Sequence, residues 1–239
     1  MKFLLSGEGP TDIGTESPTG EFLHGPMTLF IDKLATPLLK YSPRETEGKP
    51  GDILEFCSKQ KLTGAKKPTI VKLTGKRYGK DRAYFTANAQ VLGALANQRM
   101  LHEKCPYIAV LFRDGDGSNS KDEWQEKWDS IKRGFLLENY TYGVPMVPRP
   151  KSEAWLLQAH ISNTSSTETY ENRTGNKTSS SNVKEMLETL LKTHPSRQVL
   201  VDFIEDGIID PQIISKACVS FQAFRKALEN ALQVALRIR

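Results

Sequence analysis

Acidic side chains follow three apolar segments of this 239-residue chain that have the composition of buried strands. These acids are Glu8, Asp12, Asp114, Asp116 and Glu153. The carboxyl ends of parallel strands open on one edge of a sheet, so we expect the five carboxylates to lie together there. Crowded carboxylates repel one another unless a cation lies between them, and oxygen ligands of this kind suit Mg²⁺ or Mn²⁺. The pattern therefore predicts a site for one of these ions.

Each acidic motif also has an ordinary structural interpretation when taken alone. Glu8 after a strand is typical of a turn, the Asp-Gly-Asp-Gly motif at 114–117 is common turn chemistry, and Glu153 suits the first turn of a helix. A calcium loop of the EF-hand type beginning with Asp-Gly-Asp-Gly fails, because Asn119 and Gln125 stand where Gly and Glu are required. An Asp-X-Asp pair also holds the metal in some sugar-nucleotide transferases, so that activity is an alternative.

The elements that must position these acids alternate between strands and helices over the first two thirds of the chain. The apolar patterns predict strands at 2–6, 69–73, 107–112 and 142–147, and helices at 23–39, 81–102, 121–137 and from 152 onward. This alternation predicts an α/β fold with a central, mostly parallel sheet of about four strands and flanking helices. We expect one domain over residues 1–160.

The last third of the chain has a different pattern. Residues 161–182 are rich in Ser, Thr and Asn, which predicts a polar flexible loop. Helical spacing then predicts a small C-terminal helical extension, residues 183–239, packed on the same domain. The N-terminus lacks the roughly 7–15 apolar residues of a signal peptide, and no run approaches the roughly 20 that cross a bilayer. We therefore expect a cytoplasmic protein without membrane contact.

A one-sided run of positive charge lies between Lys59 and Arg82, where nine basic residues accompany Asp81 alone, in a chain of formal net charge +5. Such a run is typical of contact with a phosphate backbone, and a solvated basic loop is the alternative. Arg113, Arg149 and Lys151 flank the acidic motifs and could offset the charge of a bound phosphate. The predicted nucleic-acid-binding residues are Lys66, Lys67, Lys76, Arg77, Lys80, Arg82, Arg149 and Lys151.

The acidic motifs, in this order, resemble those of a known superfamily. Glu8 after the first strand, followed by the pair Asp114 and Asp116 after a later strand, resembles the toprim (topoisomerase–primase) domain. That resemblance implies a Rossmann-like fold whose Glu and paired Asp bind Mg²⁺ for phosphodiester chemistry. Asp12, spaced as Glu-X-X-X-Asp, and Glu153 resemble the overcoming-lysogenisation-defect nucleases. In that branch a second carboxylate set is thought to hold a second metal.

Two further stretches extend this resemblance to small stand-alone toprim-like proteins. They are Ser-Glu-Ala-Trp-Leu-Leu at 152–157 and Val-Ser-Phe-Gln-Ala-Phe at 219–224. The chain departs from topoisomerases, which are much longer and need a nucleophilic tyrosine in another domain. It also lacks the zinc-binding cysteines of primases, since Cys57, Cys105 and Cys218 are dispersed. Because no Walker motif is present, any ATPase function would belong to a partner protein.

The resemblance implies a Mg²⁺-dependent toprim-type nuclease acting on DNA or RNA. It also implies that this nuclease acts in phage defence or as a toxin. Glu8, Asp114 and Asp116 would be catalytic, and Asp12 and Glu153 would join them as metal ligands. The alternative from a different class is a noncatalytic nucleic-acid-binding or partner-docking module with a toprim-like fold.

The basic run generates a prediction of its own. If Lys66, Lys67, Lys76 and Arg77 contact phosphates, replacing all four by Ala should reduce the slope of log affinity against log salt. On B-DNA the reduction should be about 0.9 per lost contact, because each contact releases condensed counterions. Binding isotherms over a salt series measure this slope. An unchanged slope would assign the run to the solvated-loop alternative.

Overall fold

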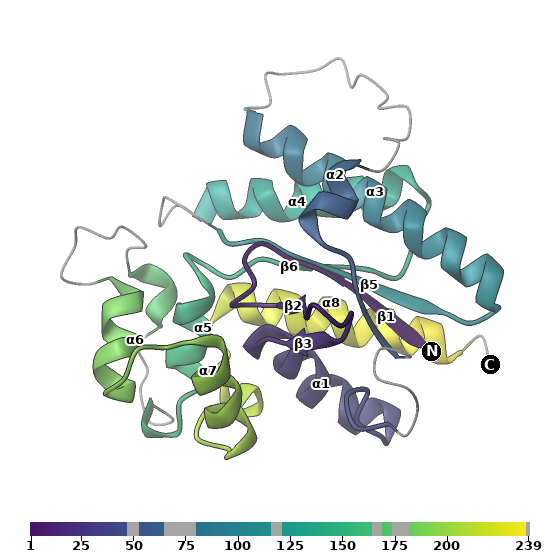
Figure 1. Cartoon of the computed structure of the whole chain (residues 1–239). Helices are drawn as coiled ribbons and strands as arrows, with labels where there is room; N and C mark the ends of the chain where they lie inside the picture. The colour runs from purple at the N-terminus through teal and green to yellow at the C-terminus, as the bar shows by residue number, and fades with distance from the viewer. Residues whose placement is uncertain (47–52, 65–79, 116–120, 164–168, 174–181, 238–239) are drawn as a thin grey trace.

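A four-stranded parallel sheet lies at the centre of the computed structural model, which describes residues 1–46, 53–64, 80–115, 121–163, 169–173 and 182–237 (Figure 1). In spatial order the strands are β4 (Leu54–Phe56), β1 (Lys2–Ser6), β5 (Tyr107–Phe112) and β6 (Gly143–Met146). All neighbouring pairs run parallel. All six residues of β5 are buried, as expected for a strand covered on both faces.

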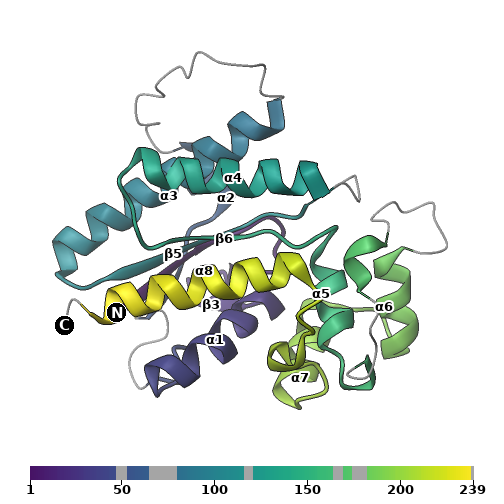
Figure 2. The same ribbon diagram turned by 180° about the vertical axis from the view of Figure 1, so that it is seen from behind.

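Helices cover both faces of this sheet, as the two opposite views show (Figures 1 and 2). One face is covered by α2 (Lys59–Gly64), α3 (Lys80–Glu103) and α4 (Lys121–Leu137), and the other by α1 (Pro26–Leu39) and α8 (Val219–Leu236). Helices α3 and α4 approach closely at Gly134, where an added Cβ would lie 2.3 Å from the Thr86 carbonyl oxygen. Glycine at this position therefore permits the close packing of the two helices.

Three further helices gather beside one end of the sheet: α5 (Ser152–Ala159), α6 (Val183–Leu191) and α7 (Arg197–Glu205). Trp155 fixes α5 onto α8, because its ring stacks on Phe224 and meets Phe221 edge-on. The Trp155 Nε1–H also donates to Ser220 Oγ at 2.8 Å. This buried contact places the first turn of α5, which contains Ser152 and Glu153, at the sheet edge.

The architecture confirms the predicted α/β fold with a parallel four-stranded sheet and C-terminal helices. Two features differ from the sequence prediction. Strand β4 and the antiparallel hairpin of β2 (Gly14–Glu16) and β3 (Phe22–His24) were not expected, because three-residue strands are too short to show a period of two. The strand predicted at 69–73 lies outside the described residues.

The polar segment 161–182 contains a buried carboxylate that its composition does not reveal. The described parts of this segment include the short 3-10 helices η1 (Ile161–Asn163) and η2 (Tyr170–Asn172), and a third such helix, η3 (Pro211–Ile213), precedes α8. Glu171 is 1% exposed. Its carboxylate accepts the backbone N–H groups of Val219 at 2.8 Å and Ser220 at 2.6 Å, at the start of α8. It also lies 3.5 Å from Arg149 Nη2. Glu171 and Val219 are 48 residues apart in the sequence, so no local sequence pattern predicts this capping contact.

Within the described residues, no helix is both long enough and apolar enough to cross a bilayer.

The Glu171 contact predicts a large effect on stability. Glu171→Ala should lower the free energy of unfolding by about 3–5 kcal/mol, because it leaves the Arg149 guanidinium buried without its carboxylate and α8 without its cap. Adding Arg149→Met should recover part of this loss. Urea unfolding measures both changes, with Glu229→Ala on the exposed side of α8 as the matched control. Equal stabilities for Glu171→Ala and Glu229→Ala would contradict the capping role.

Candidate functional site

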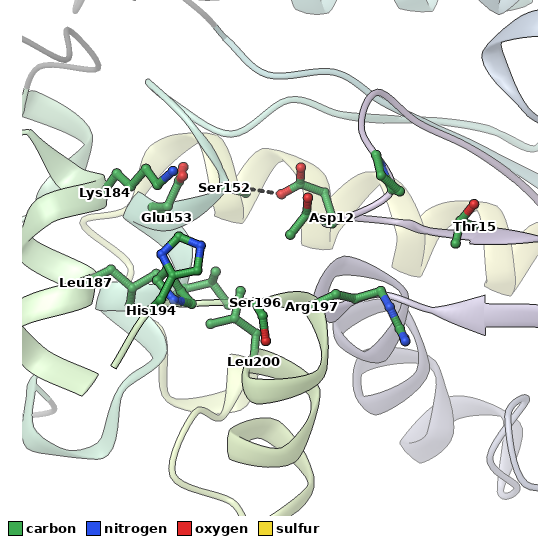
Figure 3. Close-up of a pocket in the computed structure, with 14 residues that line it drawn as sticks. Asp12, Thr15, Ser152, Glu153, Lys184, Leu187, His194, Ser196, Arg197 and Leu200 are labelled. Atoms are coloured by element: carbon green, nitrogen blue, oxygen red, sulfur yellow. Dashed lines mark hydrogen bonds between the residues drawn. The ribbon is translucent and has the colours of Figure 1, made fainter. Parts of the chain in front are cut away.

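Three segments that are far apart in the sequence meet at Ser152, the first residue of α5. The Ser152 backbone N–H donates to Asp114 Oδ1 at 3.1 Å. The Ser152 hydroxyl donates to Asp12 Oδ1 at 2.5 Å, the contact drawn as a dashed line in Figure 3. Ser152 is 3% exposed. One buried residue therefore holds two of the predicted carboxylates at the same place.

Strand register explains why the acids reach one edge of the sheet. Strands β1 and β5 are parallel, and Ser6 is paired with Leu111, so the chain leaves both strands at the same end. Glu8 and Asp114 follow at that end, as the sequence analysis expected for parallel strands.

Gly115 then allows the loop after β6 to come close to the loop after β5. Its N–H donates to the Pro148 carbonyl at 3.0 Å, and an added Cβ would lie 2.6 Å from the same oxygen. Lys127 of α4 donates to the Gly115 carbonyl, and Trp124 Nε1 donates to the Val147 carbonyl at 2.7 Å. Glycine at this position thus brings Asp114 within reach of the Ser152 N–H.

Asp12 sits in an environment that disfavours its charge. Burial raises the pKa of Asp12 to about 6, while the hydrogen bond from Ser152 opposes the rise. The negative charge of Glu153 raises the pKa further, and the positive charge of Lys151 lowers it. A carboxylate with a pKa shifted by desolvation beside a second acid is more typical of a functional site than of a scaffold.

Glu8 has a different set of neighbours. Its Oε1 lies 3.2 Å from Arg113 Nε and 3.8 Å from Lys59 Nζ. Its side chain is 33% exposed. The Glu8 carboxylate therefore contacts two cations, Arg113 and Lys59. The Asp12 and Asp114 carboxylates instead both accept hydrogen bonds from Ser152.

A pocket of about 520 Å³ opens beside Asp12 (Figure 3). Asp12, Ser152 and Glu153 form its acidic wall. The opposite side is formed by α6, by α7 and by the connection between them, and includes three cationic or titratable side chains: Lys184, His194 and Arg197. Figure 3 shows Glu153 and Lys184 on neighbouring helices at one end of this pocket. The C-terminal extension therefore contributes directly to the candidate site.

Sequence analysis did not identify Ser152, Lys184, His194 or Arg197 as site residues. Their positions depend on how α6 and α7 pack against α5, and no short sequence motif predicts that packing. Arg197, for example, donates from Nη1 to the backbone carbonyl of His24 at 2.7 Å, across 173 positions of sequence. Ser152 stood inside a quoted motif, but its two hydrogen bonds appear only in the folded chain.

The metal-binding prediction remains a prediction. Among the residues that the structure describes, no three His, Cys, Asp or Glu side chains are grouped so that they could hold one ion. Asp116, a predicted ligand, lies outside those residues. Of the other predicted ligands, Asp12 and Asp114 converge on Ser152, Glu153 lines the pocket beside Asp12, and Glu8 pairs with Arg113.

The predicted nucleic-acid-binding residues fall into two groups. Lys66, Lys67, Lys76 and Arg77 lie outside the described residues, and only the backbone of Lys80 and Arg82 is described, in the first turn of α3. Arg149 is 7% exposed and donates to Asn172 Oδ1 at 3.2 Å, so its guanidinium is engaged inside the protein. Lys151 immediately precedes α5, beside the acidic wall.

Comparisons of this chain with models of protein families, with curated proteins and with solved structures find no match.

The raised pKa of Asp12 predicts a pH-dependent gain in stability for Asp12→Asn. A carboxyl group whose folded-state pKa exceeds its unfolded value loses stability as pH rises through that window, here from about 3.8 to about 6. Asn removes this loss while it can still accept the Ser152 hydrogen bond. The variant should be more stable than wild type by about 1–2 kcal/mol at pH 7.5, and the gain should vanish near pH 4.

Urea unfolding at both pH values, in buffer containing a chelator, measures this difference. Glu21→Gln, which changes an exposed turn residue, is the matched control. A gain of the same size at both pH values would rule out Asp12 ionisation as its cause.

Proposed function

We propose that the protein is a metal-dependent nuclease that hydrolyses phosphodiester bonds of DNA or RNA. The observation that supports it best is the convergence of Asp12 and Asp114 on Ser152 at the carboxyl edge of the parallel sheet. Ligands of open α/β sheets bind at this edge. The raised pKa of Asp12 adds support, because the protein retains an acid where its charge is disfavoured.

In this proposal the carboxylates Asp12 and Asp114, together with Asp116 and Glu153, would hold Mg²⁺ or Mn²⁺. Such an ion would supply Lewis acidity toward a phosphoryl oxygen and toward the attacking water. Ser152 keeps the first two carboxylates oriented by donating to each of them. Glu8, at the same edge, is the proposed general acid or base, or a further ligand.

The alternative is a noncatalytic nucleic-acid-binding or partner-docking module. The ion pairs of Glu8 favour it, because a carboxylate engaged with Arg113 and Lys59 is not directed at the other acids in this conformation. Binding without chemistry would still use the basic run. The two functions differ in whether loss of a carboxylate changes cleavage.

Two isosteric variants separate these functions. Asp114→Asn can still accept the Ser152 N–H, and Glu8→Gln keeps the size of Glu8, but each loses one negative charge. If the protein is a nuclease, each should reduce metal-dependent cleavage by on the order of a hundredfold, while binding of nucleic acid remains. Labelled single- and double-stranded DNA and RNA, with Mg²⁺, Mn²⁺ or a chelator, provide the assay.

Glu21→Gln should cut like wild type. Wild-type protein that binds these substrates but cuts none of them, with either metal, would favour the binding module. If both carboxylate variants cut as fast as wild type, the proposed site is wrong.

A further inference from the structure

Arg113, the residue between β5 and Asp114, is a completely buried cation with unmet hydrogen-bonding capacity. Its side chain is 0% exposed. Its Nη1 donates to the Phe112 carbonyl at 2.7 Å, but Nη2 has no hydrogen-bond partner within the described part of the chain, and Nε pairs with Glu8 Oε1 at 3.2 Å without hydrogen-bond geometry. Burying donors without acceptors is unfavourable, so this arrangement is not explained by stability alone.

Tyr84 lies beside this guanidinium, and Lys59 lies beside the same Tyr84 ring. The ring centroid of Tyr84 lies 5.7 Å from the guanidinium carbon, and Lys59 Nζ lies 5.4 Å from the same centroid. The Tyr84 hydroxyl is also buried; it lies close enough to Arg113 to oppose the lowering of the Arg113 pKa, but it makes no hydrogen bond of good geometry with a described residue. Two cations, Arg113 from the end of β5 and Lys59 from α2, therefore lie beside the Tyr84 ring of α3.

One carboxylate oxygen is the anion that both cations share. Glu8 Oε1 lies 3.2 Å from Arg113 Nε and 3.8 Å from Lys59 Nζ. Two positive charges thus face one negative charge. Burial lowers the pKa of Arg113, and the nearby Tyr84 and Glu8 oppose this effect. Counted over the described residues, this cluster has more positive charge and more donor atoms than the Glu8 carboxylate balances.

We propose that Arg113, Lys59 and Tyr84 form a binding subsite for one phosphate group, in which a phosphate oxygen takes the position of Glu8 Oε1. A phosphate supplies several acceptor oxygens, which match Nη2 of Arg113, its Nε once Glu8 has turned away, and the hydroxyl of Tyr84. Glu8 is 33% exposed, so its side chain has room to turn away and uncover Arg113. The assignment of this phosphate to a nucleic-acid backbone rests on the proposed function.

Thermal unfolding in inorganic phosphate tests the subsite without any cleavage. At constant ionic strength and with a chelator present, phosphate should raise the Tm of wild type in a saturable way, because it binds the folded state. Tyr84→Phe and Lys59→Ala should each weaken the apparent phosphate affinity by about three- to tenfold. Glu8→Ala should strengthen it, because the competing carboxylate is gone. Lys61→Ala, on the same short helix as Lys59, should match wild type.

Arg113→Met separates binding from a structural role. The Tm of this variant should change little when phosphate is added. Without phosphate, its Tm should equal or exceed that of wild type, because the substitution removes an under-satisfied buried cation. A lower Tm would assign Arg113 a structural role and overturn its part in the subsite. The subsite as a whole is overturned if phosphate stabilises Tyr84→Phe, Lys59→Ala and wild type equally, or if Glu8→Ala weakens phosphate binding.

Binding of an oligonucleotide shows whether the phosphate belongs to a nucleic-acid backbone, and a cleavage assay tests the nuclease proposal independently of the subsite. A thymidine hexanucleotide should show the same order of affinities across the variants as inorganic phosphate. If the substitutions weaken the binding of inorganic phosphate but not the binding of the hexanucleotide, the assignment to a backbone phosphate is wrong. Cleavage by wild type without any phosphate response would overturn the subsite but leave the nuclease proposal standing. A rise in Tm with phosphate in a wild-type protein that cleaves no substrate would support the subsite and contradict the nuclease proposal.

Discussion

The pair of hydrogen bonds from Ser152 to Asp12 and Asp114 is the constraint on which the candidate site depends. It requires that β1 and β5 end at the same edge, that the loops after β5 and β6 approach each other at Gly115, and that α5 starts at that point. The last condition depends in turn on Trp155, which anchors α5 on the aromatic face of α8. A helix near the C-terminus thus determines where the acids near the N-terminus can be held. This dependence explains why a helical extension packs against the sheet and lines the pocket rather than forming a separate unit.

Among the described residues, the buried charges at Glu171 and at Arg113 differ in kind. At Glu171 the carboxylate is compensated by two backbone N–H groups of α8 and by the Arg149 guanidinium, although Arg149 Nε makes no hydrogen bond to a described residue. Such a set of contacts has a structural explanation, since it caps a helix and ties a polar segment to the core. At Arg113 the compensation is incomplete, because Nη2 makes no hydrogen bond to a described residue and Nε meets only the partly exposed Glu8 carboxylate. An incompletely satisfied charge at the ligand-binding edge of a sheet is harder to explain by folding, and this contrast is what directs the phosphate proposal to Arg113.

The sequence allowed the sheet edge to be predicted better than the site itself. The six-residue run of β5 and the helical spacing of α4 are long enough to show their periods, and the parallel topology then places Glu8 and Asp114 at one end. Strand β4 and the β2–β3 hairpin have three residues per strand, so the same method cannot detect them. Ser152 as the link between two acids, Glu171 as a cap and the basic side of the pocket all depend on contacts between distant segments. These contacts follow from packing, which composition and spacing do not report.

The geometry also divides the predicted carboxylates between two electrostatic environments. On one side, Asp12 and Glu153 face the pocket, and the pKa of Asp12 is raised by burial and, to a smaller extent, by the negative charge of Glu153. On the other side, Arg113 and Lys59 present more positive charge than Glu8 neutralises. A phosphodiester group bound with a divalent cation has the complementary distribution, since the cation suits the acidic side and the phosphate oxygens suit the basic side. Glu8 lies at the boundary, where its carboxylate holds the cations together in the free protein. Under the proposed function, the arrival of substrate would replace that carboxylate with phosphate and release Glu8 for chemistry. One side chain would thereby link recognition of the phosphate to assembly of the catalytic acids.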